Sequence, residues 1–416
     1  MEVVQVAGFY PPHLGGQELV VQQLARMQAR THRVTVYTSD AGARGPDVRG
    51  PDVRGPAARG PAARGPAARG PAARGPAARG PAARGPGAGG PGESDRGQPP
   101  ADGVRVVRDR AWLVAHTPVV AGLLPRLLRH RPRPDVIHVH TGQALVPDLA
   151  RLAARVRGVP YVAHVHLMVG PSGRLGRALL PVYQRLFLRG VLRDAAAVVC
   201  LTDTMRAQLV GAFGLAGHRV TVVPNGVDTG AFPVGEFARR ATRELLLVGR
   251  LTVQKNARVA VQAMRLLPRD VTLRIVGDGE LRGDLERLTA ELDLPNVRIE
   301  GRLARPALGA AYRQATAVLM PSVNEGLPLV LLEAMSAGAP VVCSALPELV
   351  EVGGEAVVPV DPVTPEALAA TVRGLLADAP RRAALSAAGR RRAEAYGWPA
   401  VAAAVDAVYA DLRTLA

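Results

Sequence analysis

Two successive series of short valine-rich runs, separated from one another by helix-length segments, constrain the fold of this chain more than any other feature. Continuous apolar runs between helices are typical of parallel strands that are covered on both faces. The first series predicts strands at 2–7, 33–38, 104–107, 135–140, 161–166, 196–201 and 219–224. The second series predicts strands at 244–249, 271–277, 297–301, 317–321, 340–344 and 356–360. We therefore expect two doubly wound α/β domains whose strand carboxyl ends face a shared cleft.

The segments between the runs predict the covering helices and the domain boundaries. We expect helices at 17–30, 117–130, 144–157, 203–213, 256–267, 280–292, 327–337 and 364–378. The alternation restarts after the stretch near 224–243, which divides a first domain at 1–224 from a second domain at 225–397. The remaining segment, 398–416, predicts a C-terminal helix that could pack back on the first domain.

A low-complexity segment at 41–102 interrupts the first domain between its second and third strands. Two copies of PDVRG and six copies of PAARG fill residues 46–85. Proline and glycine in every copy prevent a helix or a strand ladder, and the repeat has almost nothing to bury. We interpret the segment as a disordered insertion in a surface loop, where the chain tolerates it.

The net charge of +17 raises the alternative of a basic nucleic-acid-binding protein. Ten arginines and four acidic residues lie between 41 and 97, so the insertion accounts for six of these charges. Aromatic residues that could stack on bases are absent from the repeat. This location weakens the nucleic-acid alternative, and we expect no nucleic-acid partner.

Cysteine usage and the apolar runs indicate a cytoplasmic protein. Cys200 and Cys343 each end a strand-like run, which favours buried, reduced thiols. The start MEVVQVAGFYPP lacks the features of a signal peptide, and no apolar run reaches the length of a membrane span. The segment 173–193 mixes apolar residues with five arginines, so it is either a helix packed on the sheet or a basic surface for peripheral contact at the inner membrane face.

Two glutamates eight residues apart mark the stretch PSVNEGLPLVLLEAMSAGAP at 321–340. At a rise of 1.5 Å per residue, Glu325 and Glu333 would lie roughly 12 Å apart, about the span of a pyrophosphate between two sugars. Pro328 suits the first turn of the predicted helix, so the amides of Gly326 and Leu327 would lie at a helix N-terminus that can bind an anion. Glu333 lies in a helix that is apolar nearly all round and therefore needs a polar partner.

The same stretch resembles the E-x7-E signature of family 4 retaining glycosyltransferases, which have the GT-B fold. VGRLTVQKN at 248–256 is similar to the family's donor-diphosphate segment, and VVPNGVD at 222–228 to its interdomain stretch. IVGDGE at 275–280 and FYPPHLGGQE at 9–18 resemble a strand end and the glycine-rich loop of the family. The matches occur in the family's order, and the resemblance covers nearly the whole chain outside the insertion.

The resemblance implies the transfer of a hexose from a nucleotide sugar, such as a UDP-sugar, with retention of anomeric configuration. The acceptor would be a natural product or other small molecule, a glycan, or a lipid-linked glycan. No motif requires a cofactor or a divalent metal, and the motifs do not distinguish uridine from guanosine donors. A sugar-nucleotide epimerase with the GT-B fold is the alternative within the same architecture.

The resemblance also implies the residues of the site. It assigns catalytic roles to His166, Arg250, Lys255 and Glu325, and donor contacts to Gly15, Gly16, Gly249, Gly326, Leu327 and Glu333. The two cations would stabilise the departing nucleoside diphosphate. His166 would contact the donor sugar, although Leu167 stands where the family often has aspartate.

Three further histidines share the strand-like runs of the first domain. The period of two places His164 on the same face as His166, where packing is the simpler role. His138 and His140 also share a face; we expect them in the core or the cleft wall, with a metal pair as the less favoured alternative.

Overall fold

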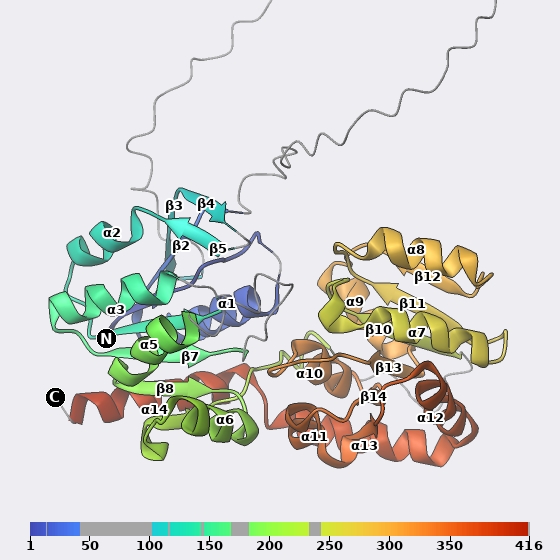
Figure 1. Ribbon diagram of the computed structural model, residues 1–416. Helices are drawn as coiled ribbons and strands as arrows, with labels where there is room; N and C mark the ends of the chain where they lie inside the picture. The colour runs from blue at the N-terminus through green and yellow to red at the C-terminus, as the bar shows by residue number, and fades with distance from the viewer. Residues whose placement is uncertain are drawn as a thin grey trace, which may run out of the picture.

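The computed structural model describes residues 1–13, 15–41, 102–114, 117–142, 145–167, 183–232 and 243–414. These residues form two α/β domains, each built on one parallel sheet with helices on both faces (Figure 1). The predicted fold class of two Rossmann-like, doubly wound domains is confirmed. Of the predicted insertion, 42–101 lie outside the described residues.

The first sheet contains seven parallel strands in the order β3-β2-β1-β6-β7-β8-β9. Their bounds are β1 (Glu2–Val6), β2 (Arg33–Ser39), β3 (Val104–Asp109), β6 (Val136–Thr141), β7 (Tyr161–Val165), β8 (Ala197–Cys200) and β9 (Val220–Val222). The strand order reverses between β1 and β6, which places a switch point at their carboxyl ends. The register sets His140 of β6 directly beside His164 of β7.

The second sheet contains six parallel strands in the order β12-β11-β10-β13-β14-β15. Their bounds are β10 (Glu244–Val248), β11 (Thr272–Val276), β12 (Val297–Glu300), β13 (Ala317–Met320), β14 (Val341–Ser344) and β15 (Val357–Val360). Here the order reverses between β10 and β13. Ligands of open α/β sheets bind outside the carboxyl ends of strands at such a point, so this edge is a natural place for a ligand.

The helices occupy the segments between the strands. In the first domain they are α1 (Gly16–Gln28), α2 (Leu123–Arg129), α3 (Val146–Arg157), the π-helix η1 (Gln184–Leu188), α5 (Arg189–Asp194), α6 (Asp203–Phe213) and the short η2 (Gly217–Arg219). In the second they are η4 (Val253–Lys255), α7 (Ala257–Ala263), η5 (Met264–Leu266), α8 (Arg282–Glu291), α9 (Arg305–Gln314), α10 (Leu329–Ser336), α11 (Pro347–Gly353), η6 (Gly354–Ala356), α12 (Pro365–Ala377) and α13 (Ala379–Glu394). Of the segment 173–193, only residues from 183 onward are described, and they form η1 and α5.

The helix predicted at 117–130 is wrong in its first half. Residues 117–120 form β5 (Thr117–Val120), which pairs antiparallel with β4 (Ala111–Val114), and Trp112 lies opposite Val119. β-Branched residues favour this extended pairing, so the helix α2 starts only at Leu123.

Three helices, α9, α11 and α13, have no counterpart among the predicted elements. The buried face of α13 is mostly small, with Leu385, Ser386, Ala388, Gly389 and Ala393. Small residues give a weak apolar period, which explains why the pattern does not reveal this helix.

The chain crosses between the domains twice, and the two crossings lie side by side. The Val227 amide donates to the Tyr396 carbonyl at 2.7 Å, and Val227 pairs with Gly397 in an isolated parallel bridge. After the second crossing, helix α14 (Trp398–Thr414) runs along the first domain and packs on α1 (Figure 1). Its buried Trp398, Val405 and Tyr409 belong to the same apolar cluster as Val20 and Leu24 of α1.

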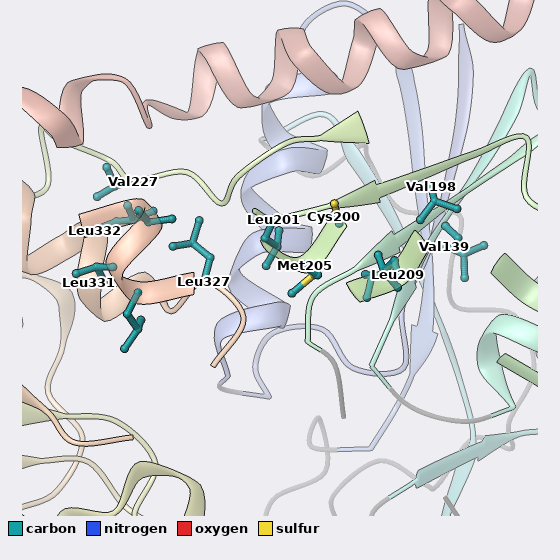
Figure 2. Packing of buried hydrophobic residues seen from close by; sticks show 14 of the residues in the cluster. Val139, Val198, Cys200, Leu201, Met205, Leu209, Val227, Leu327, Leu331 and Leu332 are labelled. Carbon is teal, nitrogen blue, oxygen red and sulfur yellow. The ribbon is translucent and has the colours of Figure 1, made fainter. Parts of the chain in front are cut away.

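One apolar cluster continues from the first domain into the second. Figure 2 shows Leu201, Met205 and Leu209 of the first domain in line with Leu327 and the helix α10 of the second. Burial of this shared surface holds the strand ends of the two sheets toward each other. Among the residues that the structure describes, no helix is long and apolar enough to cross a membrane.

Candidate active site

The site is built around the carboxyl ends of β10 and β13 in the second domain. A pocket at this switch point is lined by Leu247, Val248, Lys255, Leu319, Met320, Pro321 and Ser322. Two loops close its rim, because the Gln254 side chain donates to the Asn324 carbonyl at 2.7 Å and the Val323 amide donates to the Gln254 carbonyl at 2.9 Å.

These loops bring Lys255 and Glu325, which are 70 positions apart in sequence, into one ion pair. The Lys255 Nζ lies 2.5 Å from the Glu325 Oε1, and the two side chains are 17% and 6% exposed. Lys255 is the only lysine among the 52 basic residues of the chain. A compact ammonium in a chain that otherwise uses arginine suggests a position where the planar guanidinium fork would not serve.

Three glycines let the loops behind Lys255 stack closely. Gly249 has φ of +151°, and a Cβ there would lie 3.3 Å from the Lys255 Cε. A Cβ on Gly277 would lie 1.9 Å from the Gly249 oxygen, and one on Gly279 would lie 2.5 Å from the Leu251 oxygen. The predicted site includes Gly249 but omits Gly277 and Gly279. Their position directly after the β11 strand was the sequence signal that could have identified them.

Arg250, the second predicted cation, is exposed at the end of β10. Within the described part of the chain, no acidic side chain forms an ion pair with it. Its guanidinium is therefore available for an anionic ligand that reaches the strand end.

Glu333 lies on the buried face of α10 and is 8% exposed. The Tyr312 hydroxyl donates to its Oε2 at 2.9 Å, so Tyr312 of α9 is the polar partner that the sequence required. Burial raises the pKa of the Glu333 carboxyl to about 7, against smaller lowering effects from the Tyr312 hydrogen bond and the charge of Arg305. An isolated tyrosine in the sequence gave no sign of this contact.

The helix after Glu325 begins two residues later than predicted. Pro328 is the N-cap, with an extended ψ of 133°, and α10 starts at Leu329. Proline disfavours helical geometry in the residue before it, so Gly326 and Leu327 belong to the preceding loop and not to the helix terminus.

Gly326 and Leu327 instead join the second domain to the first. A Cβ on Gly326 would lie 2.1 Å from the carbonyl oxygen of His166, so only glycine fits against the end of β7. The Asn225 side chain donates to the Leu327 carbonyl at 2.6 Å. The loop that carries Glu325 therefore reaches the residue predicted to contact the donor sugar.

His166 follows β7 and is almost fully buried, as are three neighbouring histidines. Its ring stacks on His164 at a centroid distance of 4.2 Å, and its Nε2 lies 2.9 Å from His140 Nδ1. Burial lowers the pKa of His166 to about 3 and that of His138 to about 3, with a smaller effect of His166 on His138. The imidazoles are therefore neutral at neutral pH.

One ring nitrogen from each of His138, His140 and His164 lies within 4.8 Å of the others, close enough to suggest a metal group. However, His138 and His140 already have both ring nitrogens in hydrogen bonds, to Tyr409, His164, His166 and Gln5. This pattern supports a core role, one of the two placements, core or cleft wall, that the sequence predicted for them.

Gly15 and Gly16 lie at the start of α1, where Gly15 is the N-cap. The Glu18 carboxylate folds over this terminus, because a Cβ on Gly15 would lie 2.2 Å from the Glu18 Oε2. The other oxygen of Glu18 lies 2.9 Å from His13 Nδ1. The helix N-terminus thus already holds one negative charge, which disfavours a phosphate there. Glu18 was not predicted as a site residue.

Two family models match the chain. The model of glycosyl transferases group 1 matches residues 236–392, and the model of glycosyltransferase family 4 matches residues 85–231. A glycogen synthase of Mycobacterium tuberculosis is 33% identical over 322 residues, which cover 72% of this chain and 75% of the relative. A D-inositol 3-phosphate glycosyltransferase of Kineococcus radiotolerans is 33% identical over 325 residues, which cover 70% and 74%.

Two solved structures share the fold. The sucrose-phosphate synthase of Thermosynechococcus elongatus has a TM-score of 0.70 at 20% identity and covers 100% of this chain and 99% of its own. Anabaena HepE in complex with UDP and glucose has a TM-score of 0.70 at 15% identity and covers 99% and 100%.

Proposed function

The chain belongs to the glycosyltransferases of group 1 and family 4, and from this membership we propose that it transfers a hexose from a nucleotide sugar to an acceptor hydroxyl with retention of configuration. HepE was crystallised with UDP-glucose, which supports a uridine nucleotide as the donor class. The acceptor is a small molecule, a glycan or a lipid-linked glycan.

The observation that carries this proposal is the Lys255–Glu325 pair at the switch point of the second sheet. In the absence of a donor each side chain neutralises the other. A donor diphosphate would attract Lys255 and the exposed Arg250, and the Glu325 carboxylate would then accept hydrogen bonds from sugar hydroxyls. Cations held in place before the reaction stabilise charge that grows on the departing diphosphate.

Glu333 would hold the ribose of the donor. Its Oε2 accepts from Tyr312, and a carboxylate can accept further hydrogen bonds from ribose hydroxyls when the nucleotide binds. Keeping a carboxylate at this depth costs stability whenever it is ionised, so its presence favours a functional role over a packing role.

Replacing Glu333 by glutamine is expected to stabilise the protein and to weaken donor binding. The pKa of Glu333 is about 7 in the folded chain and 4.5 in the unfolded chain, so its ionisation makes folding less favourable as pH rises from 4.5 through 7. Above pH 7 the variant should gain up to about 3 kcal/mol in unfolding free energy, and below pH 4.5 it should gain nothing. Loss of a charged hydrogen-bond acceptor should raise the donor KM about 10- to 100-fold.

Urea unfolding of both proteins between pH 4.5 and 8 measures the first effect, and steady-state kinetics measures the second. Glu366→Gln on α12 is the control, because Glu366 lies in the first turn of that helix and away from the pocket. A gain in stability that does not depend on pH would contradict the assigned pKa, and an unchanged KM would contradict the ribose contact.

The first domain would supply the acceptor side of the cleft. We assign a sugar-hydroxyl contact to His166, which adjoins the Glu325 loop through Gly326. The start of α1 at Gly15 and Gly16, covered by the Glu18 carboxylate, suits a hydroxyl-bearing acceptor better than the donor diphosphate, because carboxylates accept from hydroxyls and repel phosphates.

Retention without a covalent intermediate fits the arrangement of carboxylates. On the first-domain face the residue after His166 is Leu167, which cannot act as a nucleophile. Glu325 is held by Lys255 on the donor side. The departing diphosphate, stabilised by Lys255 and Arg250, can itself take the proton of the acceptor hydroxyl while that oxygen bonds the anomeric carbon on the same face.

The configuration of the product tests this mechanism. The anomeric proton coupling of the product, measured by NMR, should match that of the donor sugar. Intact-mass spectrometry during turnover should show no sugar adduct on the protein. An inverted coupling would contradict retention, and an adduct mapped to Glu325 would show that this carboxylate is a nucleophile.

A further inference from the structure

Two chains of hydrogen bonds connect the helix α14 with His164 and His166, at the carboxyl end of β7, through the interior of the first domain. Gln5, Gln28, His138 and His140 are at most 1% exposed, and His164 is 2% exposed. Water therefore does not set the direction of these bonds, and the donor or acceptor character of each group has to be consistent along each chain.

The first chain has a defined direction because it starts at a carboxylate, which only accepts. The Gln28 amide donates to the Asp406 Oδ1 at 2.7 Å, which leaves the Gln28 carbonyl to accept from the Gln5 amide at 2.9 Å. The Gln5 carbonyl then faces His140 Nε2 at 3.3 Å and makes that nitrogen the protonated one. His140 Nδ1 must accept, so His166 Nε2, at 2.9 Å, carries the proton of His166.

The second chain starts at Tyr409 of α14. The Tyr409 hydroxyl lies 2.6 Å from His138 Nδ1, and His138 Nε2 lies 3.1 Å from His164 Nδ1. A hydroxyl can donate or accept, so this chain, unlike the first, has no group that fixes its direction.

Both chains end near the carboxyl end of β7 in a nitrogen that is buried and has no hydrogen-bond partner within the described residues: Nδ1 of His166 and Nε2 of His164. The direction of the first chain makes Nδ1 of His166 an acceptor lone pair. A buried acceptor that lacks a donor costs free energy, and a ligand hydroxyl can relieve that cost.

We propose that Asp406 is a positioning residue that fixes the Nε2–H tautomer of His166 through Gln28, Gln5 and His140, so that His166 offers its Nδ1 lone pair to a sugar hydroxyl. The sugar contact rests on the proposed glycosyl transfer, whereas the tautomer follows from the hydrogen bonds alone. Helix α14, which returns from the second domain, thereby sets the chemistry of a residue at the cleft.

Nitrogen-15 NMR of the full chain labelled at histidine tests the tautomer directly, since protonated and unprotonated ring nitrogens have well-separated shifts. The signals of His166 are assigned by their loss in His166→Gln. We expect a protonated Nε2 and an unprotonated Nδ1 of His166 in the wild-type protein, in which the tautomer itself is measured. A proton on Nδ1 of His166 would overturn the proposal.

Asp406→Asn tests the source of the direction. The asparagine amide can donate as well as accept, so the hydrogen bonds from residue 406 to His166 can also run in the opposite direction. The Nδ1–H tautomer of His166 should then appear. Asp411→Asn, an exposed acid on the same helix, is the matched control and should leave the tautomer unchanged. Unchanged histidine tautomers in folded Asp406→Asn would overturn the relay.

Kinetics separates this inference from the proposed function. Asp406→Asn should raise the donor KM about two- to tenfold, as expected for one neutral hydrogen bond, and Asp411→Asn should not. If the tautomer shifts as expected while the donor KM does not change, the sugar contact of His166 is wrong. Absence of any sugar transfer by the wild-type protein would refute the proposed function and leave the NMR result standing.

Discussion

Replacing Lys255 by alanine is expected to lower kcat by about 10²- to 10³-fold, the usual effect of losing one charge stabiliser that is held in place before the reaction. The ammonium is partly buried beside Glu325, at the switch point of the second sheet, where a donor diphosphate would leave. The same substitution leaves the Glu325 carboxylate buried and unpaired, so the unfolding free energy should also fall by about 3–5 kcal/mol.

The double variant Lys255→Ala/Glu325→Gln separates the two effects. Removing the unpaired charge should restore most of the stability, whereas turnover should stay low. Arg265→Ala, an exposed cation in the neighbouring η5, is the control for a general loss of positive charge. Turnover that recovers together with stability would show that Lys255 serves the fold and not the reaction.

Lowering the pH from 7 to 5 is expected to destabilise the first domain strongly. The pKa of His138 and of His166 falls from 6.5 to about 3 on folding, because both rings are buried. Below pH 6.5 the unfolded chain therefore binds more protons than the folded chain, and stability falls with falling pH. At pH 5 each of these two histidines should cost about 2 kcal/mol. Burial lowers the pKa of His140 and His164 as well, which adds to the effect.

The cost of these two histidines, about 4 kcal/mol together, is a substantial fraction of the usual folding stability of about 5–15 kcal/mol. Glu333 acts in the opposite direction over the same range, so the Glu333→Gln variant should show the histidine effect without that compensation. Urea unfolding of Glu333→Gln at pH 5, 6 and 7 measures the histidine effect. Replacing the exposed His218 by glutamine should leave the change of the unfolding free energy with pH as it was. An unfolding free energy of Glu333→Gln that does not change between pH 7 and 5 would be incompatible with neutral, buried rings.

The strands and motifs that can be recognised from a short stretch of sequence were predicted. The valine-rich runs located the strands of both sheets, and the motif that contains Lys255 and the one that contains Glu325 lie on adjacent loops of the structure. The start of α10 was misplaced because Pro328 can serve either as an N-cap or within the first turn, and only the backbone distinguishes these positions.

Contacts between distant segments could not be predicted from local patterns. Tyr312 reaches Glu333 from another helix, and the relay joins Gln5 to Asp406 from opposite ends of the chain. Glutamine and aspartate in amphipathic helices ordinarily face solvent, so nothing in the sequence distinguished Gln28 and Asp406 from surface residues.

The central claim is that Lys255 meets the diphosphate of a nucleotide donor, and the lysine content of the chain permits a direct measurement. Reductive methylation with carbon-13 formaldehyde keeps the positive charge and labels only Lys255 and the terminal α-amine, because the sequence has no other lysine. Lys255→Arg assigns the side-chain signal by its loss. Titration with UDP, GDP and ADP, followed by carbon-13 NMR, should shift the Lys255 signal with at least one nucleotide and leave the α-amine signal in place. A Lys255 signal that none of the three nucleotides moves would contradict the account.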